Sequence, residues 1–270
     1  MKHIRTIINK EWAEVFKNKM VLSVVLIMPI LFAILPLVML GATSSTTTLN
    51  ISPEEAGLPP ELTSSICSGM NAGECTQVYL LSQFMLFFVM MPLIIPTTIA
   101  AYSVVGEKTT RSLEPLLATP TTTIELLVGK CFAAVVPAIA ATFLSFLIFN
   151  LGILSLGRSM VSSQVHAYIL SPTWLVGILL LGPVLSIISA MFAIFVSSRV
   201  NDPRVAEQIA SVMIVPFLGV FMLSSFGIIA LNLKSMVLAV IVCAFLAGGL
   251  LYLGTLIFDR WLPRRPPPAS

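Results

Sequence analysis

The sequence predicts an all-α, polytopic membrane protein: six transmembrane helices preceded by an amphipathic helix in the membrane interface. Hydrophobic residues make up 57% of the 270 residues, and charged residues only 10%. A mean hydropathy of +1.00 is too high for a water-soluble fold of this length, which could not bury that much apolar surface. Six apolar runs reach the roughly 20 residues that a bilayer-crossing helix needs, at 20–41, 78–105, 126–156, 173–198, 209–232 and 236–258.

The basic residues set the predicted orientation of these spans. With both termini in the cytoplasm, Arg158 and Lys234 are the only basic residues left outside, which satisfies the positive-inside rule. We therefore expect a multi-pass protein of the plasma membrane. Its net charge of +3 reflects this orientation in the lipid bilayer and gives no indication of nucleic-acid binding. The predicted organisation has three parts: an interfacial helix at 1–19, a transmembrane domain at 20–258 and a disordered tail at 259–270. Within the transmembrane domain we expect an outer loop at 42–77 and cytosolic loops at 106–125 and 199–208.

Residues 1–19 have the pattern of an interfacial helix. At 100° per residue, apolar side chains that include Ile8, Trp12 and Val15 fall on one face, and lysines occupy the other. Glu11 interrupts the apolar face, so we expect this acid to have a basic partner. The alternative, a basic flank that only orients the first span, explains the lysines but not the apolar face.

Two of the four cysteines lie in the predicted outer loop. Cys67 and Cys75 would meet an oxidising environment there, and a disulfide closing this short ring would contribute about 2 to 3 kcal/mol. The alternative is a pair of free thiols. Cys131 and Cys243 fall inside spans, where cysteine behaves as a small apolar residue.

A polar run between the second and third spans, residues 106–130, reads GEKTTRSLEPLLATPTTTIELLVGK. It concentrates charge in a chain that has little, so we expect it to project into water as a docking element. Thr119-Pro120 ends its first helical stretch, because proline lacks an amide hydrogen and disfavours helical geometry in the preceding residue. Gly129-Lys130 then lie at the entry to the third span, 126–156.

This pattern resembles the cytosolic loop of type-2 ATP-binding-cassette (ABC) exporter permeases: a Glu ending one span, T-R-S-L-E-x-L-L-x-T-P, then Gly-Lys entering the next span. The resemblance implies a coupling helix that docks on a separate ATPase subunit. It also implies a smaller contact in 199–208, where Asp202 could cap a helix; the alternative there is a solvated turn. The coupling residues it implies are Glu107, Lys108, Arg111, Ser112, Leu113, Glu114, Leu116, Leu117, Thr119, Pro120, Asp202 and Arg204.

The same resemblance implies an elbow helix with a Lys-Glu pair, here Lys10-Glu11 beside Trp12, and a homodimer or a dimer with a related permease. Two ATPase copies would bind ATP and Mg, and this chain would hold no cofactor or metal. Only Lys234 and Ser235 separate the last two predicted spans, so the re-entrant outer helices of many relatives have little room. The cargo is not indicated. The family's path along spans two and five would run past Thr97, Thr98, Tyr102, Ser224 and Ser225.

Missing motifs weigh against other classes. No G-x-x-x-x-G-K-[ST] occurs, so the chain itself is not expected to bind ATP in a phosphate loop. The first five predicted spans lack a mid-membrane charge, which argues against an ion-coupled secondary transporter or channel. His3 and His166 fall on opposite sides, and no hydrolase motif is present, so the chain is not expected to be an enzyme. A non-catalytic scaffold would leave the polar run without a role.

Overall fold

The computed structural model describes residues 2–43, 67, 69–109, 123–156, 161–226, 228–229 and 231–261. These residues are almost entirely helical and contain no strand. Within these ranges, six helical segments are long and apolar enough to cross a membrane. The predicted all-α, six-span class is therefore confirmed.

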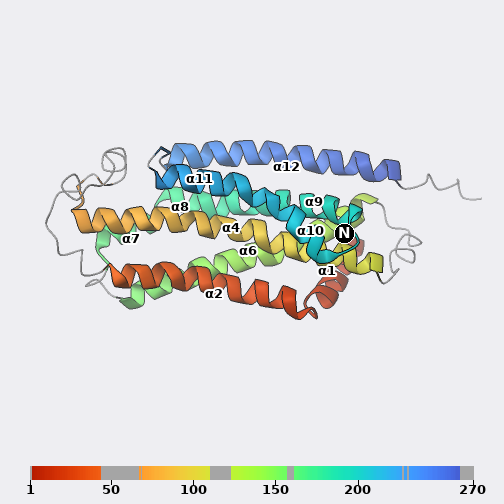
Figure 1. Ribbon diagram of the computed structural model, residues 1–270, viewed down its shortest axis with the longest axis horizontal. Helices are drawn as coiled ribbons and strands as arrows, with labels where there is room; N and C mark the ends of the chain where they lie inside the picture. Colours follow the sequence, from red (N-terminus) through yellow and green to blue (C-terminus); the bar gives the residue numbers. More distant parts are fainter. Residues whose placement is uncertain are drawn as a thin grey trace, which may run out of the picture.

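The spans run antiparallel along one bundle (Figure 1). A short helix α1 (Lys2–Val15) precedes the first span, α2 (Lys19–Ala42), and the next two spans are α4 (Ala72–Thr109) and α6 (Thr123–Leu156). The fourth combines α7 (Ser163–Ile169), α8 (Pro172–Val176), a π-helical turn η2 (Gly177–Leu181) and α9 (Gly182–Arg199). The fifth combines α10 (Pro203–Ala210), a 3₁₀ turn η3 (Ser211–Ile214) and α11 (Val215–Ser225), and α12 (Leu233–Trp261) is the sixth.

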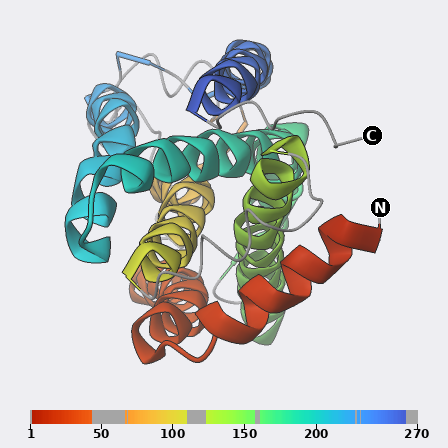
Figure 2. The ribbon, with the colours of Figure 1, turned by 90° about the vertical axis from the view of Figure 1, so that its right-hand side faces the viewer.

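Two ends of the bundle can be distinguished in Figure 1. The α1 end carries α1, α10 and the ends of α4 and α9, and the α7 end carries α7 and the turn between α11 and α12. Viewed from the α1 end, α1 runs across the bundle in front of α6 (Figure 2). This crossing direction is what an interfacial helix requires.

Capping residues explain where several spans begin. α4 begins six residues before the predicted 78, because Asn71 Oδ1 accepts from the Glu74 amide (3.0 Å) and Glu74 Oε2 accepts from the Asn71 amide (3.2 Å). This reciprocal pair satisfies two free donors of the first turn. Asp202 Oδ1 likewise accepts from the Arg204 amide (2.8 Å), so the predicted cap of α10 is present.

The predicted boundary between the last two spans was wrong. Residues 226–232 separate α11 from α12, where the sequence pattern left only 234–235. The apolar residues after Ser225 misled the span count, while Asn232 and Ser235 form the true start of α12 through paired hydrogen bonds (3.0 and 3.1 Å). The turn at the α7 end is therefore longer than expected.

Burial is uneven among the spans. α4 is buried along most of its length, packing against α9, α6 and α2. The segment 203–225 and α12 instead expose many large apolar side chains, including Phe245 and Leu238.

At the α7 end, Trp174 stacks on Phe149 (ring centroids 6.0 Å apart) and Phe146 (6.1 Å) and meets Phe88 edge-on (5.8 Å). A Cys67–Cys75 disulfide lies at the same end, with a Cα–Cα distance of 5.3 Å.

Candidate functional site

Five polar side chains from α1, α4 and α6 form one connected network at the α1 end. Lys130 Nζ lies 2.6 Å from Glu11 Oε1 and 2.7 Å from Glu107 Oε2. Lys10 Nζ pairs with Glu107 Oε1 at 2.9 Å. The Ser103 hydroxyl accepts from Lys130 (3.0 Å) and donates to Glu11. Two ammonium groups and two carboxylates thus balance each other's charge, and we call this set the charge network.

The position of α1 follows from its amphipathic sequence. Its inward face carries Glu11 and Val15, both buried, and Trp12 Nε1 donates to the Ala133 carbonyl of α6 at 2.9 Å. Gly129 lets α1 approach α6 closely, since a Cβ at that position would lie 2.8 Å from Ile7 Cγ2. The expected elbow helix, with its acid facing a basic partner, is therefore present in the fold.

Burial makes the charge network sensitive to its geometry. Glu11 and Glu107 are 2% exposed and Lys130 is 7% exposed. Such charges lose hydration that only close pairing offsets, so removing one partner leaves a costly bare charge. Lys10 is at the rim: burial alone would lower its pKa, but the hydrogen bond and charge of Glu107 raise that pKa above its ordinary value. Lys10 is therefore protonated at neutral pH.

The charge network lies beside chain segment 110–122, at the end of α4 and the start of α6. We call these two helix ends the roots of the segment. Glu107 lies two residues before the last residue of α4, and Lys130 lies in the second turn of α6. Their 2.7 Å contact holds the two helices together where that segment leaves and returns. Movement of one root must therefore carry the other root and α1 with it, unless the pairing breaks.

Lys108 connects the same root to the fourth span. Its Nζ donates to the carbonyls of Ser197 (3.0 Å), Ser198 (2.6 Å) and Val200 (3.0 Å) at the end of α9. Helix ends leave such carbonyls without helical partners, and a lysine there also complements the helix dipole. Lys108 therefore fastens the end of α4 to the chain leading into α10.

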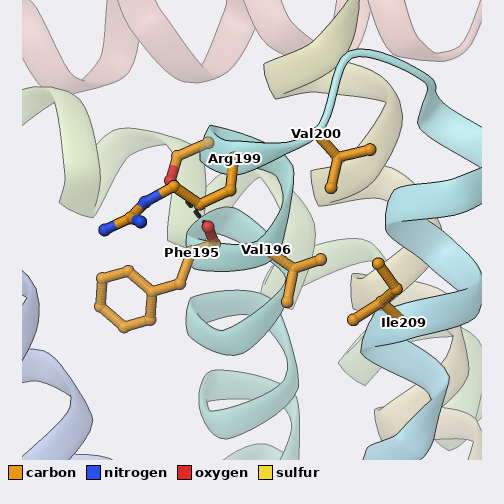
Figure 3. Close-up of a pocket in the computed structure, with 6 residues that line it drawn as sticks. Phe195, Val196, Arg199, Val200 and Ile209 are labelled. Atoms are coloured by element: carbon orange, nitrogen blue, oxygen red, sulfur yellow. Dashed lines mark hydrogen bonds between the residues drawn. The ribbon is translucent and has the colours of Figure 1, made fainter.

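A shallow pocket of about 350 Å³ lies at the end of α9 beside α10. Val196 and Val200 face Ile209 of α10, while the Phe195 ring and the Arg199 guanidinium extend on the other side of α9 (Figure 3). Ser198 returns its hydroxyl to the Phe195 carbonyl at 2.7 Å. The walls are mostly apolar, so the pocket offers packing surface but no cluster of catalytic groups.

Most of the predicted coupling residues fall outside the described residues, and their role stays a prediction: Arg111, Ser112, Leu113, Glu114, Leu116, Leu117, Thr119 and Pro120. For the others the contacts are known. Glu107 and Lys108 bind within the chain, as described above, and Asp202 caps α10 beside Arg204. Glu107 is thus buried in α4, where the sequence pattern suggested a water-exposed loop.

The predicted cargo-path residues separate into two groups. Thr98, Ser224 and Ser225 lie along the seam between α4 and the fifth span: Ser225 donates to Gln83 Oε1 (3.0 Å), and Gln83 donates to Ser224 (3.3 Å). Thr98 bonds Glu207 on α10. Thr97 and Tyr102 do not join this seam. The Thr97 hydroxyl returns to the Leu93 carbonyl (2.6 Å), and the Tyr102 hydroxyl reaches Met20 Sδ of α2 (2.7 Å).

Sequence reasoning missed several residues of these sites. Lys130 and Ser103 were not recognised as partners of Glu11, although an acid on an apolar face indicated that some partner exists. Glu207 was placed in the cytosolic loop 199–208, because the predicted fifth span began at 209. The helix that begins at Pro203 already includes it, and the Asp202-Pro203 start was the available signal.

Comparison with known proteins agrees with this architecture. Neither a curated protein nor a solved structure matches the chain. One family model, described as ABC-2 family transporter protein, matches residues 5–254. That match covers α1 from residue 5 on, all six spans except the end of α12, and the whole charge network. The chain therefore belongs to the ABC-2 family of membrane transporter proteins.

Proposed function

We propose that the chain is the permease subunit of an ABC exporter, moving cargo outward with energy from ATP hydrolysed by a separate ATPase. The family supports a membrane permease that works with an ABC ATPase subunit. The finer proposal is two permease copies, as a homodimer, with two ATPase copies that hold the ATP and Mg. Both termini of each permease copy would lie in the cytoplasm and the spans in the plasma membrane.

The charge network is the observation that carries this proposal. It joins α1, α4 and α6 at both roots of segment 110–122, where the sequence resemblance places the coupling helix. Buried ion pairs hold only in a narrow geometry, so the joined elements move together. Lys108 extends this connection to α9 and α10. A push on the segment would thus reach four of the six spans.

In the proposed cycle, closure of the ATPase dimer on ATP displaces segment 110–122 of each permease copy. Because the charge network ties its two roots, the displacement moves α1, α4 and α6 as one unit. α9 and α10 follow through the Lys108 contacts. The bundle then changes from an inward-open to an outward-open arrangement, and ATP hydrolysis resets it.

The experiment that tests this proposal reverses one charge in the proposed docking segment. A Glu114→Lys chain should insert and dimerise normally but lose the ATPase in co-purification, because a like-charge contact at an interface costs several kcal/mol. Glu61→Lys is the matched control, the same reversal in the predicted outer loop, and should retain the ATPase. Unchanged ATPase association and transport in Glu114→Lys would refute the coupling role.

The runner-up class, an ion-coupled transporter or channel, makes a different prediction. Such a protein would move cargo in proteoliposomes that contain only this chain and an ion gradient. The ABC proposal expects no transport there and requires ATP with the partner subunit. A scaffold would transport nothing under either condition.

A further inference from the structure

Glu207 is an acid of the fifth span that has no basic partner among the described residues. The Thr98 hydroxyl of α4 donates to Glu207 Oε1 at 2.5 Å. Among the described residues, no lysine or arginine lies within ion-pair distance of Glu207, and its second oxygen, Oε2, has no hydrogen-bond partner. The side chain is half-buried, so this oxygen belongs to a group that a ligand can reach.

The depth of Glu207 follows from its partner on α4. At 1.5 Å per residue, Thr98 lies about 16 Å along α4 from its end at Thr109. It also lies about 7 Å further into the bundle than Ser103, the contact of the interfacial helix α1. Ala206, the residue before Glu207, packs with Ala101 and Val105 of α4, at the level of Ser103, so Glu207 starts from the α1 end of the bundle and its side chain reaches inward to Thr98. A half-buried acid loses part of its hydration, and that loss is offset only when a positive charge pairs with it.

The surroundings of this acid are apolar and partly open. Ile94 lies one turn before Thr98 on the same face of α4 and is half-buried, whereas the Tyr102 hydroxyl, one turn after Thr98, is directed to Met20 of α2. On α10 the neighbouring Ala206 and Ala210 are buried against the bundle. A ligand that approaches Glu207 thus meets one negative charge beside aliphatic surface, rather than a ring of oxygens that would replace the water around a small ion.

We propose that Glu207, oriented by Thr98, is the recognition group for an amphiphilic organic cation carried as cargo. The ligand supplies a positive charge that the described residues do not bring to Glu207, and its apolar part lies along α4. This inference rests on the proposed export function, since it names the cargo class of the same permease. It concerns residues on the α4–α10 seam, away from the charge network.

The test measures equilibrium binding of tetraphenylphosphonium to the full chain in phosphatidylcholine nanodiscs, without an ATPase. Glu207→Gln should weaken binding by about tenfold or more, because it removes the paired charge at a partly desolvated site. Thr98→Val should weaken it by about fivefold, the effect of one hydrogen bond. Glu207→Asp should retain more affinity than Glu207→Gln. Glu14→Gln, an exposed acid on α1, should bind as the unmodified chain does.

Two kinds of result would overturn the inference. One is binding that does not depend on charge, seen either as equal affinity of the unmodified and Glu207→Gln chains or as equal binding of neutral triphenylphosphine oxide. Either would make the Thr98–Glu207 contact a structural bridge between helices. The other is displacement of the probe by sodium but not by potassium at equal ionic strength, which would identify an inorganic-ion site. Thermal unfolding and gel filtration of each variant show whether it is folded.

The outcome is separable from that of the proposed export function. Binding that depends on Glu207, in a chain that never associates with an ATPase, would refute the export proposal but keep the cation site. Loss of the ATPase in Glu114→Lys, together with unchanged binding in Glu207→Gln, would do the reverse.

Discussion

The two ends of the bundle are stabilised by different chemistry. At the α1 end, Glu11, Glu107 and Lys130 are buried ions whose contacts are 2.6 and 2.7 Å long. At the α7 end, the aromatic rings around Trp174 and the Cys67–Cys75 disulfide take their place. Both ends bring together elements far apart in the sequence, yet one does so with charges and the other with apolar rings and a covalent bond.

This difference indicates where force can pass through the molecule. An ion network is favourable only while each charge keeps its partner, so its helices separate at high cost or move together. Aromatic contacts accept a range of tilts and lose energy gradually as rings slide. The α1 end is therefore suited to transmit a displacement, and the α7 end to tolerate one.

The largest expected effect comes from breaking the α1 end. Lys130→Met leaves Glu11 and Glu107 buried without their shared cation, which should cost about 3 to 5 kcal/mol. Thermal unfolding of the purified chain in detergent measures the loss. Lys10→Met is the matched control: Lys10 is 34% exposed, and of its two ion-pair partners Glu107 keeps Lys130 while Glu14 is exposed, so its effect should be clearly smaller. Equal effects of the two variants would show that burial does not govern this network.

The disulfide gives the next effect. Cys67→Ser together with Cys75→Ser should destabilise the chain by about 2 to 3 kcal/mol, because the unfolded chain regains the freedom of the ring. In intact cells, both thiols of the unmodified chain should resist a membrane-impermeant maleimide until a reductant is added. Labelling without reduction would contradict an oxidised pair on the outer side.

A milder change sharpens the comparison at the aromatic end. Phe149→Leu keeps the site apolar but removes the ring stacked on Trp174, and should cost about 1 to 1.5 kcal/mol. The same thermal assay applies. Tryptophan fluorescence should also shift, since Trp174 is fully buried. A loss as large as that of Lys130→Met would show that the α7 end is as sensitive to its partners as the charge network.

The smallest effect on stability is expected for Glu114→Lys. The residue lies in the predicted cytosolic loop, and surface substitutions usually change stability by less than about 0.5 kcal/mol. Its unfolding temperature should match that of the unmodified chain even though ATPase association is lost. A large drop in unfolding temperature would mean that Glu114 packs within the permease itself.

Hydrophobic patterning predicted the class of fold well and its boundaries poorly. Six spans and the amphipathic face of residues 1–19 follow from where apolar residues recur. The early start of α4 depends on the Asn71–Glu74 pair, which hydropathy does not detect, and the apolar residues after Ser225 look like a continuing span. Glu107 and Glu207 were assigned to loops for the same reason, because a charge was taken to mark the end of a helix.

The sequence by itself determined the membrane class, the number of spans and the family resemblance, because each depends on composition and local order along the chain. It also indicated that Glu11 needs a basic partner, since an acid on an apolar face cannot remain bare. Which base fulfils that need was decided only by the tertiary structure, which brings Lys130 within 2.6 Å of it across 119 positions of sequence. The physical reason is that burial and pairing of charge depend on distance in space, and local periodicity fixes only the face on which a residue lies.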